Sequence, residues 1–297
     1  MLPSQKKFGG DAGLQADSVD SDQAMERFLS GVAILGDDFT SDQIRQWYAD
    51  EAEAYAELGA GKRDSYRYHY HAMNELHGFR FLPKGRSFPK TVGFGSAYGE
   101  ELLPIVDRLD SIAIVDPSDA FVGRDIGGRP ATWLKPVPSG VLPFASESID
   151  LITCFGVLHH IPNVSFVLRE FRRVLKPGGY CLVREPIVSM GDWRKPRKGA
   201  TARERGLPLP IFDEAISRAG LEVVTKRLMG FGPLLWLLRK FNYNPYNSKV
   251  ITRVDWLLAH LSNVNYRYHS EEGDLIQRFR PTAAYWVLRH PVVKQDE

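Results

Sequence analysis

Two adjacent histidines are the residues of this chain best placed for proton transfer near neutral pH. His159 and His160 follow the apolar run IDLITCFGV, which predicts a buried strand. Imidazole titrates close to neutrality and often serves as a general base. Ligands of open α/β sheets bind at the carboxyl ends of the strands. Either histidine is therefore a candidate catalytic residue, and a purely structural role is the alternative.

A glycine loop is the second feature with chemical potential. The stretch TVGFGSAYG places Gly93, Gly95 and Gly99 between a predicted strand and a predicted helix. Glycine lets the backbone approach a ligand closely, and the helix start offers free N–H groups. Asp116 ends the next predicted strand, where a carboxylate can bind ribose hydroxyls. Both features fit an adenosine-containing cofactor, and they leave open whether it is NAD or S-adenosylmethionine.

A basic segment, GDWRKPRKGATARERG at 191–206, follows another predicted strand. It carries six cationic side chains: Arg194, Lys195, Arg197, Lys198, Arg203 and Arg205. At the ligand-binding edge of a sheet it is expected to bind a phosphate or carboxylate of an acceptor, and the arginine fork favours Arg194 and Arg197. A solvated charged loop is the other interpretation.

The segment YRYHYHAMNELH concentrates aromatic and imidazole side chains. No carboxylate or cysteine completes a metal-ligand set among its histidines, so no metal is predicted. Tyr70 and His71 are candidate residues for lining an acceptor site, and exposed packing is the alternative.

Composition restricts the class of protein. The chain has 297 residues, 43% hydrophobic and 25% charged, with a net charge of +2. This balance predicts a globular enzyme and argues against a nucleic-acid binder. The longest apolar stretch, at 230–238, is too short to span a bilayer, and no secretory signal is evident. Cys154 and Cys181 lie in apolar runs and are expected to be reduced, so a cytoplasmic location is predicted.

The order of predicted elements indicates three regions. Residues 1–39 form a tail and lead-in, and 40–88 form a helical cover with helices over 40–59 and 65–78. Thr40 and Gln43 predict a capping box at the start of the first helix. Strands and helices alternate from 89 to 297, which indicates a parallel sheet with crossover helices. Residues from about 230 to 280 read as an irregular aromatic insertion before the last strand.

The block VLPFASESIDLITCFGVLHHIPN, followed by LREFRRVLKPGGYCLVREP, resembles class I S-adenosylmethionine-dependent methyltransferases of the small-molecule type, those with a methyltransferase domain 11. The resemblance implies an α/β fold with a Rossmann-like, doubly wound, seven-stranded sheet. Its strand order would be 3-2-1-4-5-7-6 with the last strand antiparallel. A helical cover would precede the sheet, and the insertion would come before the last strand.

The same resemblance implies roles for particular residues around S-adenosylmethionine. Gly93 and Gly95 would follow the methionine moiety, Asp116 would hold the ribose, and Pro117 would be a further cofactor-binding residue. Leu142 would flank the adenine, while Phe155 and Gly156 would lie near the sulfonium. Tyr48 and Tyr55 of the helical cover would close over the donor, although both could simply pack a helix face.

Three positions depart from the pattern of that family. Thr91 and Pro138 stand where acidic residues usually contact the cofactor's ammonium group and adenine amine, and Ala97 stands where a third glycine is usual. Losing charge-assisted hydrogen bonds should weaken cofactor binding unless other groups replace them. Glu100 and the tyrosines of the first helix are the expected replacements.

The function predicted from the sequence is methyl transfer to a small-molecule or glycoconjugate acceptor, with O-methylation of an acceptor that carries an acidic group. A nucleotide-dependent oxidoreductase and a non-catalytic methyltransferase-like scaffold are the alternatives. For the segment from about 230 to 280, a substrate lid, a dimer contact and a shallow membrane-surface element all fit its aromatic and basic composition.

Overall fold

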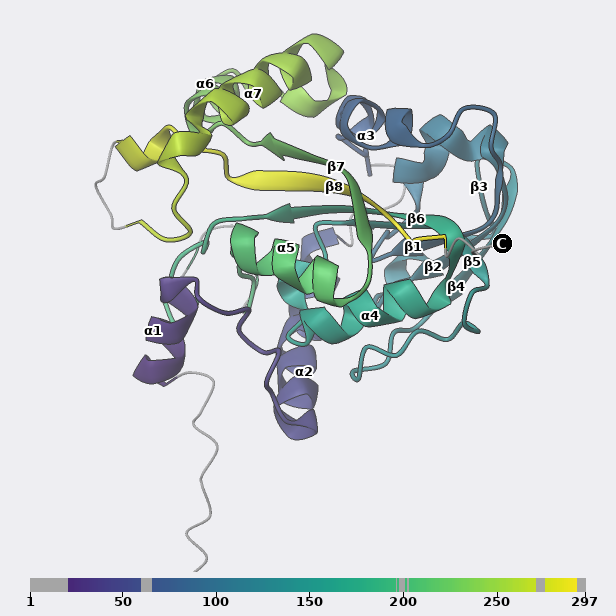
Figure 1. Ribbon diagram of the computed structural model, residues 1–297, viewed down its shortest axis with the longest axis horizontal. Helices are drawn as coiled ribbons and strands as arrows, with labels where there is room; N and C mark the ends of the chain where they lie inside the picture. The colour runs from purple at the N-terminus through teal and green to yellow at the C-terminus, as the bar shows by residue number, and fades with distance from the viewer. Residues whose placement is uncertain are drawn as a thin grey trace, which may run out of the picture.

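An eight-stranded mixed sheet runs through the molecule in the order β3-β4-β2-β1-β5-β6-β8-β7 (Figure 1). The structure, a computed structural model, describes residues 21–59, 66–195, 197, 201, 203–270 and 276–292, except for the side chains of 52–59 and 276. The strands are β1 (Phe88–Phe94), β2 (Leu109–Val115), β3 (Asp125–Ile126), β4 (Arg129–Leu134), β5 (Ile149–Phe155), β6 (Leu175–Pro186), β7 (Glu222–Met229) and β8 (Ala283–Arg289).

The central strands are parallel, and the end of the sheet is antiparallel. Strand β1 pairs in parallel with β2 and β5, and β5 with β6, whereas β8 is antiparallel to both β6 and β7. The prediction of seven strands was wrong by one, because β3 adds a two-residue antiparallel strand at the edge. Gly127 and Gly128 both have positive φ, 57° and 80°, as a two-residue hairpin turn requires.

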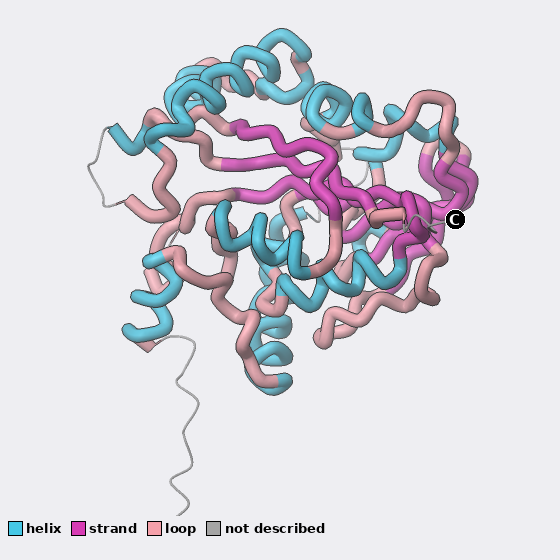
Figure 2. Tube along the Cα trace, in the orientation of Figure 1, coloured by secondary structure: helices cyan, strands magenta, loops and turns pink. Residues whose placement is uncertain are grey.

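Helices cover both faces of the sheet (Figures 1 and 2). Helices α4 (Val164–Val174) and α5 (Leu209–Arg218) lie on one face. Helix α3 (His71–His77) and the 3-10 helix η3 (Glu100–Arg108) pack on the other, where α7 (Lys249–Leu261) contacts α3 and β7. Because the central strands are covered on both sides, β5 is apolar along most of its length rather than alternating.

The N-terminal helices match the prediction only in part. Helix α2 (Ser41–Gly59) begins with the predicted capping box, in which Thr40 N donates to Gln43 Oε1 at 2.9 Å. Helix α1 (Asp22–Ser30) lies within the predicted lead-in. The second helix was predicted over 65–78 but begins only at His71, and residues 66–70 are not helical. The alternation of tyrosine with other residues in YRYHY has the period of two that suits an extended segment.

The segment from about 230 to 280 is largely helical, so the prediction of an irregular insertion was wrong for it. It contains α6 (Gly232–Lys240), η6 (Pro245–Asn247), α7 (Lys249–Leu261) and η7 (Ser262–Asn265). Ser248 caps α7 by accepting from Ile251 N, a helix-start signal that the sequence contained. Buried Asp255 of α7 accepts from Gly230 N and Phe231 N at 2.8 and 2.9 Å, which fixes α7 to the start of α6.

Short 3-10 turns complete the described chain: η2 (Phe79–Phe81), η4 (Asp119–Phe121), η5 (Leu158–His160) and η8 (Ile276–Arg278). Across the residues that the structure describes, no helix combines the length and apolar character needed to cross a membrane.

Candidate active site

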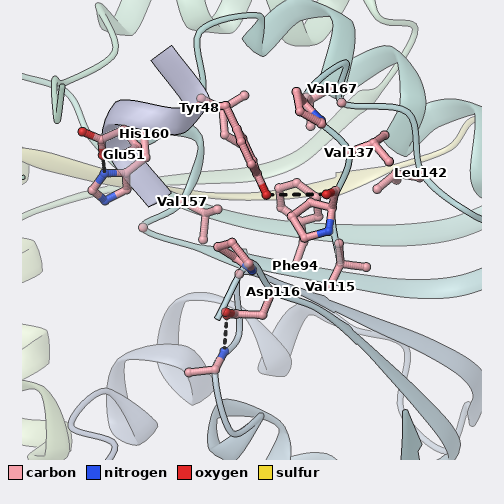
Figure 3. Close-up of a pocket in the computed structure, with 18 of the residues that line it drawn as sticks. Tyr48, Glu51, Phe94, Val115, Asp116, Val137, Leu142, Val157, His160 and Val167 are labelled. Carbon is pink, nitrogen blue, oxygen red and sulfur yellow. Dashed lines mark hydrogen bonds and ion pairs between the residues drawn. The ribbon is translucent and has the colours of Figure 1, made fainter. Parts of the chain in front are cut away.

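A cavity of about 270 Å³ lies over the carboxyl ends of β1, β2 and β5 (Figure 3). Its lining includes six of the predicted cofactor residues: Tyr48, Gly95, Asp116, Pro117, Leu142 and Gly156. The side chain of Tyr55 lies outside the described residues, and Gly93 lines neither this cavity nor the one beside it. The predicted ribose, adenine and cover residues therefore meet in one place.

A second cavity, of about 290 Å³, adjoins the first and shares Tyr66, Gly95 and Ala97 with it. Its other lining residues are Arg67, Tyr68, His69, Tyr70, Ser96, Glu101, Phe155 and Arg184. The shared glycine loop joins the two cavities. A ligand bound along this loop would extend from one cavity into the other.

The glycine loop keeps the left-handed backbone angles of a ligand-binding glycine loop, even though Ala97 replaces a glycine. Gly95 has φ of 65°, and a Cβ placed on it would lie 2.4 Å from the side chain of Val157. Ala97 adopts φ of 47°, the left-handed region that glycine normally occupies. Its N–H donates to Asp116 Oδ2 at 2.9 Å, which holds the loop against the end of β2. Ala97 therefore preserves the conformation that a third glycine would adopt.

Asp116 is buried and lines the first cavity beside this loop. Its carboxylate accepts from Ser118 N as well as from Ala97 N. Burial raises its pKa, while these two amides act in the opposite direction. A carboxylate at this strand end fits the predicted ribose contact.

Asp116→Ala is expected to lower affinity for S-adenosylmethionine by at least about tenfold, because it removes one charge-assisted contact to the ribose and loosens the glycine loop. Calorimetric titration of the folded variant measures this change. Asp110→Ala is the matched control, since Asp110 is exposed near the opposite end of the same strand, β2. A folded Asp116→Ala protein with wild-type affinity would disprove this placement of the ribose.

Tyr48 lies across the first cavity, on helix α2 (Figure 3). Its hydroxyl lies 3.5 Å from the carbonyl of Pro136, on the segment that leads to Pro138 and Leu142. Pro138 also lines the cavity, so an apolar ring lies where a carboxylate was expected. The part of the cavity near Pro138 and Leu142 is therefore lined by apolar side chains.

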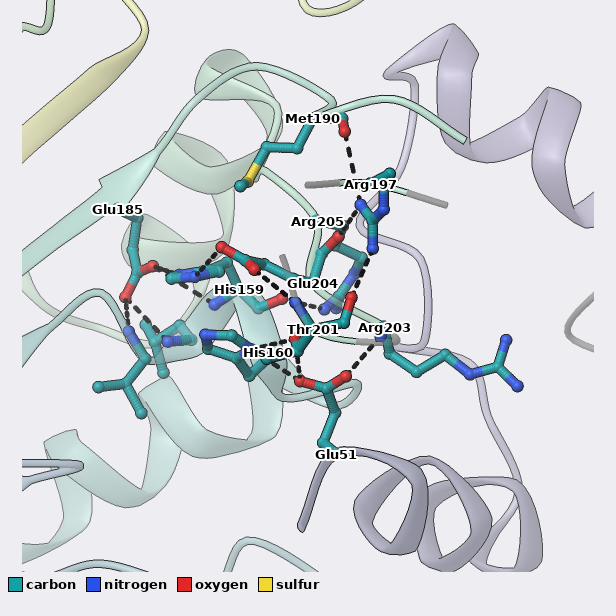
Figure 4. Close-up of polar contacts among 12 residues, drawn as sticks. Glu51, His159, His160, Glu185, Met190, Arg197, Thr201, Arg203, Glu204 and Arg205 are labelled. Carbon is teal, nitrogen blue, oxygen red and sulfur yellow. Dashed lines mark hydrogen bonds and ion pairs between the residues drawn. The ribbon is translucent and has the colours of Figure 1, made fainter. Parts of the chain in front are cut away.

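His159 lies in a buried polar cluster (Figure 4). Its Nδ1 lies 2.6 Å from Glu185 Oε2 and its Nε2 lies 3.4 Å from Glu204 Oε1. Burial lowers the pKa of His159, but the two carboxylates outweigh burial and raise this pKa to about 9. His159 is therefore protonated at neutral pH, lines neither cavity, and is poorly suited to be a base.

His160 has the opposite electrostatic setting. Burial and the neighbouring His159 lower its pKa, so the ring is neutral near pH 7. Its Nδ1 lies 2.7 Å from Glu51 Oε2 of α2, and the ring lines the first cavity. Of the two predicted histidines, only His160 lines one of the two cavities and is neutral near pH 7, so the prediction of a general base is kept for His160 alone.

The same cluster joins helix α2 to the segment 201–205. Glu51 accepts from Thr201 Oγ1 at 2.7 Å and from the backbone N–H of Arg203. The ligand atoms of His159, His160 and Glu204 lie within 4.8 Å of one another, close enough for a metal ion. Each of the three already contacts a protein partner, so the cluster acts as a polar connection between α2, η5 and residues 203–205.

Glu101 is a buried carboxylic acid for which the sequence predicted no role. It is 3% exposed and lines the second cavity next to the glycine loop. Its Oε1 accepts from Thr153 Oγ1 at 3.3 Å, and burial raises its pKa to about 7. Thr91, in contrast, turns its hydroxyl to the carbonyl of Phe88. The expected replacement, Glu100, instead accepts from Tyr68 N at 3.3 Å and does not line either cavity.

Two arginines line the second cavity: Arg67 is exposed, and Arg184 is partly buried. The guanidinium of Arg184 lies 4.2 Å from the ring centre of Tyr70 and 5.6 Å from that of Phe155. Its described polar contacts are Met73 Sδ at 3.6 Å and the carbonyl of Phe155 at 3.4 Å, with no carboxylate within ion-pair distance among the described residues. Arg184 therefore brings a partly buried positive charge to the lining of this cavity.

The two predicted acceptor residues of the helical cover separate in the structure. Tyr70 lines the second cavity, whereas His71 does not, and the backbone N–H of His71 donates to Asn247 Oδ1 at 3.1 Å. Tyr66 and Tyr68 lie beside Tyr70 on the extended segment and also line the cavity. The alternating tyrosines of YRYHY were the signal that could have identified them.

The four arginines of the basic segment make contacts within the chain, and Lys198 lies outside the described residues. Arg194 pairs with Asp192 at 3.1 Å and Asp22 at 2.5 Å, and Arg197 donates to the carbonyls of Thr201 and Glu204. Buried Arg205 donates to backbone carbonyls, including that of His159 at 3.0 Å. Neither Arg194 nor Arg197 lines either of these two cavities, and their contacts do not support the predicted acceptor role.

Comparisons with known proteins agree with this geometry. Residues 92–183 match the family model described as a methyltransferase domain. A sterol 4-C-methyltransferase of Caenorhabditis elegans is 28% identical over 111 residues, 35% of this chain and 33% of that protein. A demethylmenaquinone methyltransferase of Bacillus velezensis is 46% identical over 44 residues, 15% of this chain and 19% of that protein. The chain thus matches about a third or less of the length of these relatives.

Solved structures share the fold at low sequence identity. The [4+2]-cyclase SpnF has a TM-score of 0.53 and 17% identity, with 88% of this chain and 99% of that chain covered. A Leishmania major protein described as a S-adenosylmethionine-dependent methyltransferase has a TM-score of 0.51 and 11% identity, with 84% and 91% covered. At such identities the likeness shows the fold alone.

The sheet topology, the glycine loop and Asp116 at the end of β2 give this chain a Rossmann-like fold similar to that of class I S-adenosylmethionine-dependent methyltransferases. Residues 92–183 match a methyltransferase domain, and the cofactor that this match implies is S-adenosylmethionine. The acceptor has to be argued from the second cavity, since a fold does not determine a substrate.

Proposed function

We propose that this protein transfers the methyl group of S-adenosylmethionine to a hydroxyl oxygen of a small-molecule or glycoconjugate acceptor that carries an anionic group. The observation that carries the proposal is the placement of Arg184 in a tyrosine-lined cavity adjoining the cofactor cavity along the glycine loop. The cofactor, when bound, supplies the activated methyl group. The protein aligns the two ligands and accepts a proton.

The first cavity has the residues to hold the adenosine part of the cofactor. Asp116 would accept from the ribose hydroxyls, and Leu142, Pro117 and Pro138 would contact the adenine. A Cβ at Gly95 would collide with Val157, so glycine is required there, and its bare backbone can approach the methionine part closely. The residues present therefore fit the cofactor that the domain implies.

Glu101 is the proposed partner of the cofactor's ammonium group. It lines the cavity beside the glycine loop, and it is buried near Thr153 of β5, the residue paired with Gly93 of β1. Thr91 cannot provide a carboxylate there. Glu101 thus supplies from the next helix the negative charge that β1 lacks.

Glu101→Gln is expected to raise the Kd for S-adenosylmethionine by about 10- to 100-fold, because a neutral amide replaces a charge-assisted contact. The carboxyl is neutral below its pKa of about 7 and anionic above it. Wild-type affinity should therefore increase as pH rises through about 7, and the variant should lack this increase. Calorimetric titration across that range measures both effects.

Two controls make the experiment specific to the ammonium contact. The ligand 5′-methylthioadenosine lacks the amino-acid part of the cofactor, so its affinity should be the same in both proteins. Glu100→Gln alters the neighbouring carboxylate, which lines neither cavity, and should leave the affinity unchanged. Equal losses for both ligands in Glu101→Gln would contradict the assignment.

The second cavity fits a ring-shaped acceptor with a negative charge. Tyr66, Tyr68 and Tyr70 provide aromatic surface that can pack against a sugar or aromatic ring, and Arg184 can form two parallel hydrogen bonds with a carboxylate or phosphate. Burial raises the pKa of Tyr66 and of Tyr68, so both hydroxyls remain protonated hydrogen-bond donors. We assign the anion to Arg184 rather than to Arg194 and Arg197.

A methylation assay with paired acceptors tests the proposed function. Sugar acids, sugar phosphates and hydroxyaryl acids, each beside a neutral ester or unphosphorylated analogue, are incubated with radiolabelled S-adenosylmethionine. Methyl transfer to members of an anionic set, with little to their neutral analogues, is the expected result. Transfer only to neutral acceptors, or to carbon rather than oxygen, would contradict the proposal.

A further inference from the structure

The α6–η6–α7 hairpin presents an apolar surface to solvent. This hairpin surface consists of Trp236, Leu237, Phe241, Val250, Val254, Leu257 and Leu261, all exposed. Trp236 is 58% exposed, Phe241 75% and Val250 66%, values unusual for such large apolar side chains. The four α7 members are spaced by four, three and four residues, so they form one stripe along the helix.

The opposite side of α7 is the side that packs on the protein. Thr252, Asp255 and Ala259 are buried, and α7 contacts both β7 and α3. The exposed stripe is therefore additional to the face that the fold uses. Figure 1 shows the hairpin along one border of the molecule, beside α3 and away from α4 and α5.

The exposed charged residues of the hairpin itself are basic, and one of them, Lys249, forms an ion pair with Glu75 of α3. Between residues 230 and 270, all of which are described, the basic residues Arg239, Lys240, Lys249, Arg253 and Arg267 are exposed. The sole carboxylate of that range, Asp255, is buried and accepts from two backbone N–H groups. Lys240 also lies over the ring of Trp236, with its Nζ 3.7 Å from the ring centre. The surface thus combines apolar side chains with positive charge.

The hairpin lies next to the second cavity. Tyr246, between the two helices, stacks on Tyr70 of the cavity lining with ring centres 5.6 Å apart and planes 26° apart. Asn247 accepts from the backbone N–H of His71. A surface that binds the hairpin would therefore lie near residues that line the second cavity.

We infer that the hairpin surface docks on an anionic lipid bilayer, with its apolar side chains in the headgroup region and its cations near lipid phosphates. Amphipathic helices with aromatic and aliphatic side chains flanked by basic residues bind membranes in this way. A second copy of the chain is a poorer fit, because pairing this surface with itself would bring like charges together. The docking site does not depend on the proposed chemistry, although it would suit an acceptor attached to a lipid.

Cosedimentation of the full chain with vesicles tests the inference. Vesicles of phosphatidylcholine with phosphatidylglycerol should bind the protein, and vesicles of phosphatidylcholine alone should bind it at least about tenfold more weakly. Val254→Glu with Leu257→Glu, and separately Lys240→Glu with Arg253→Glu, should each reduce binding to the anionic vesicles by about tenfold or more. Val32→Glu, which alters an exposed valine at the end of α1, is the matched control and should bind like wild type.

Three results would overturn the inference. They are no binding of the wild-type protein to anionic vesicles, equal binding to both vesicle types, and unchanged binding of both double variants. A wild-type dimer that the same substitutions dissociate, without any vesicle binding, would assign the surface to a second copy instead. Affinity for S-adenosylmethionine, measured on each variant, shows whether the variant is folded. The vesicle result does not depend on whether the proposed methyl transfer is correct.

Discussion

His160→Gln is expected to lower turnover by about 10²- to 10⁴-fold, the usual contribution of a general base, and to change affinity for S-adenosylmethionine far less. The ring lines the cofactor cavity, its pKa is lowered so that it is neutral near pH 7, and Glu51 contacts its Nδ1. The reaction rate of the wild type should fall as pH drops and the imidazole becomes protonated. The variant should lack that titration.

His159→Gln provides the comparison. His159 is buried between Glu185 and Glu204, and its pKa of about 9 lies above the ordinary value of 6.5. Because the folded-state pKa is raised, its contribution to stability is present below about pH 6.5 and is lost as pH rises through about 9. This variant should therefore lose thermal stability at neutral pH, with a smaller difference at high pH. Near wild-type turnover in His160→Gln, or a larger loss of turnover in folded His159→Gln, would refute the assignment of the base.

Arg184→Met is expected to lower kcat/KM for an anionic acceptor by about 100-fold or more, because it removes a partly buried charge that pairs with the acceptor. The loss should appear mainly in KM, since the contact exists before and during the reaction. Arg184→Lys should be intermediate, because lysine keeps the charge but lacks the planar fork. Steady-state kinetics with an acceptor from the paired assay measures both variants.

The matched control for Arg184 is Arg194→Met. Arg194 already pairs with Asp192 and Asp22 and lines neither cavity. Its substitution should leave acceptor kinetics unchanged. An effect as large as that of Arg184→Met would instead support the basic segment as the anion site, as the sequence alone suggested. Equal losses in Arg184→Met for an anionic acceptor and its neutral analogue would show that Arg184 supports the fold rather than the charge.

The sequence predicted the parts of the fold that depend on local patterns. The continuous apolar run in IDLITCF is what a strand covered on both faces requires, and it forms β5. The capping box at Thr40 and Gln43 also depends only on residues close in the sequence, and this prediction was confirmed. The edge strand β3 was missed because two residues carry no periodicity, although the following Gly-Gly pair favours a hairpin turn.

Site residues that directly follow a strand could be predicted from the sequence. Site residues that reach the cavities only through packing between distant segments could not. Asp116 follows a strand directly, so its place at the sheet edge could be inferred. Glu101 read as an ordinary acid at a helix start, and its burial beside Thr153 comes from the packing of η3 on the sheet. Arg184 read as one member of the pair Arg-Glu that ends β6. Only the fold shows that it reaches the tyrosines of residues 66–70.

For the arginines of the basic segment, the sequence suggested an anion-binding role that their described contacts do not support. Six cations within 191–206 suggested an anion site, because a sequence shows charge but not the partners that neutralise it. In the structure Asp22 is far along the chain from Arg194 and still pairs with it. Backbone carbonyls, which no charge count includes, occupy Arg197 and Arg205.

Calorimetric titration of the purified chain with S-adenosylmethionine, S-adenosylhomocysteine and NAD is the most direct test that the two adjoining cavities form a methyltransferase active site. We expect the first two ligands to bind with one site per chain, and NAD not to bind. Binding of NAD in their place would indicate a nucleotide-dependent oxidoreductase. A folded protein that binds none of the three would contradict the account and indicate a methyltransferase-like scaffold.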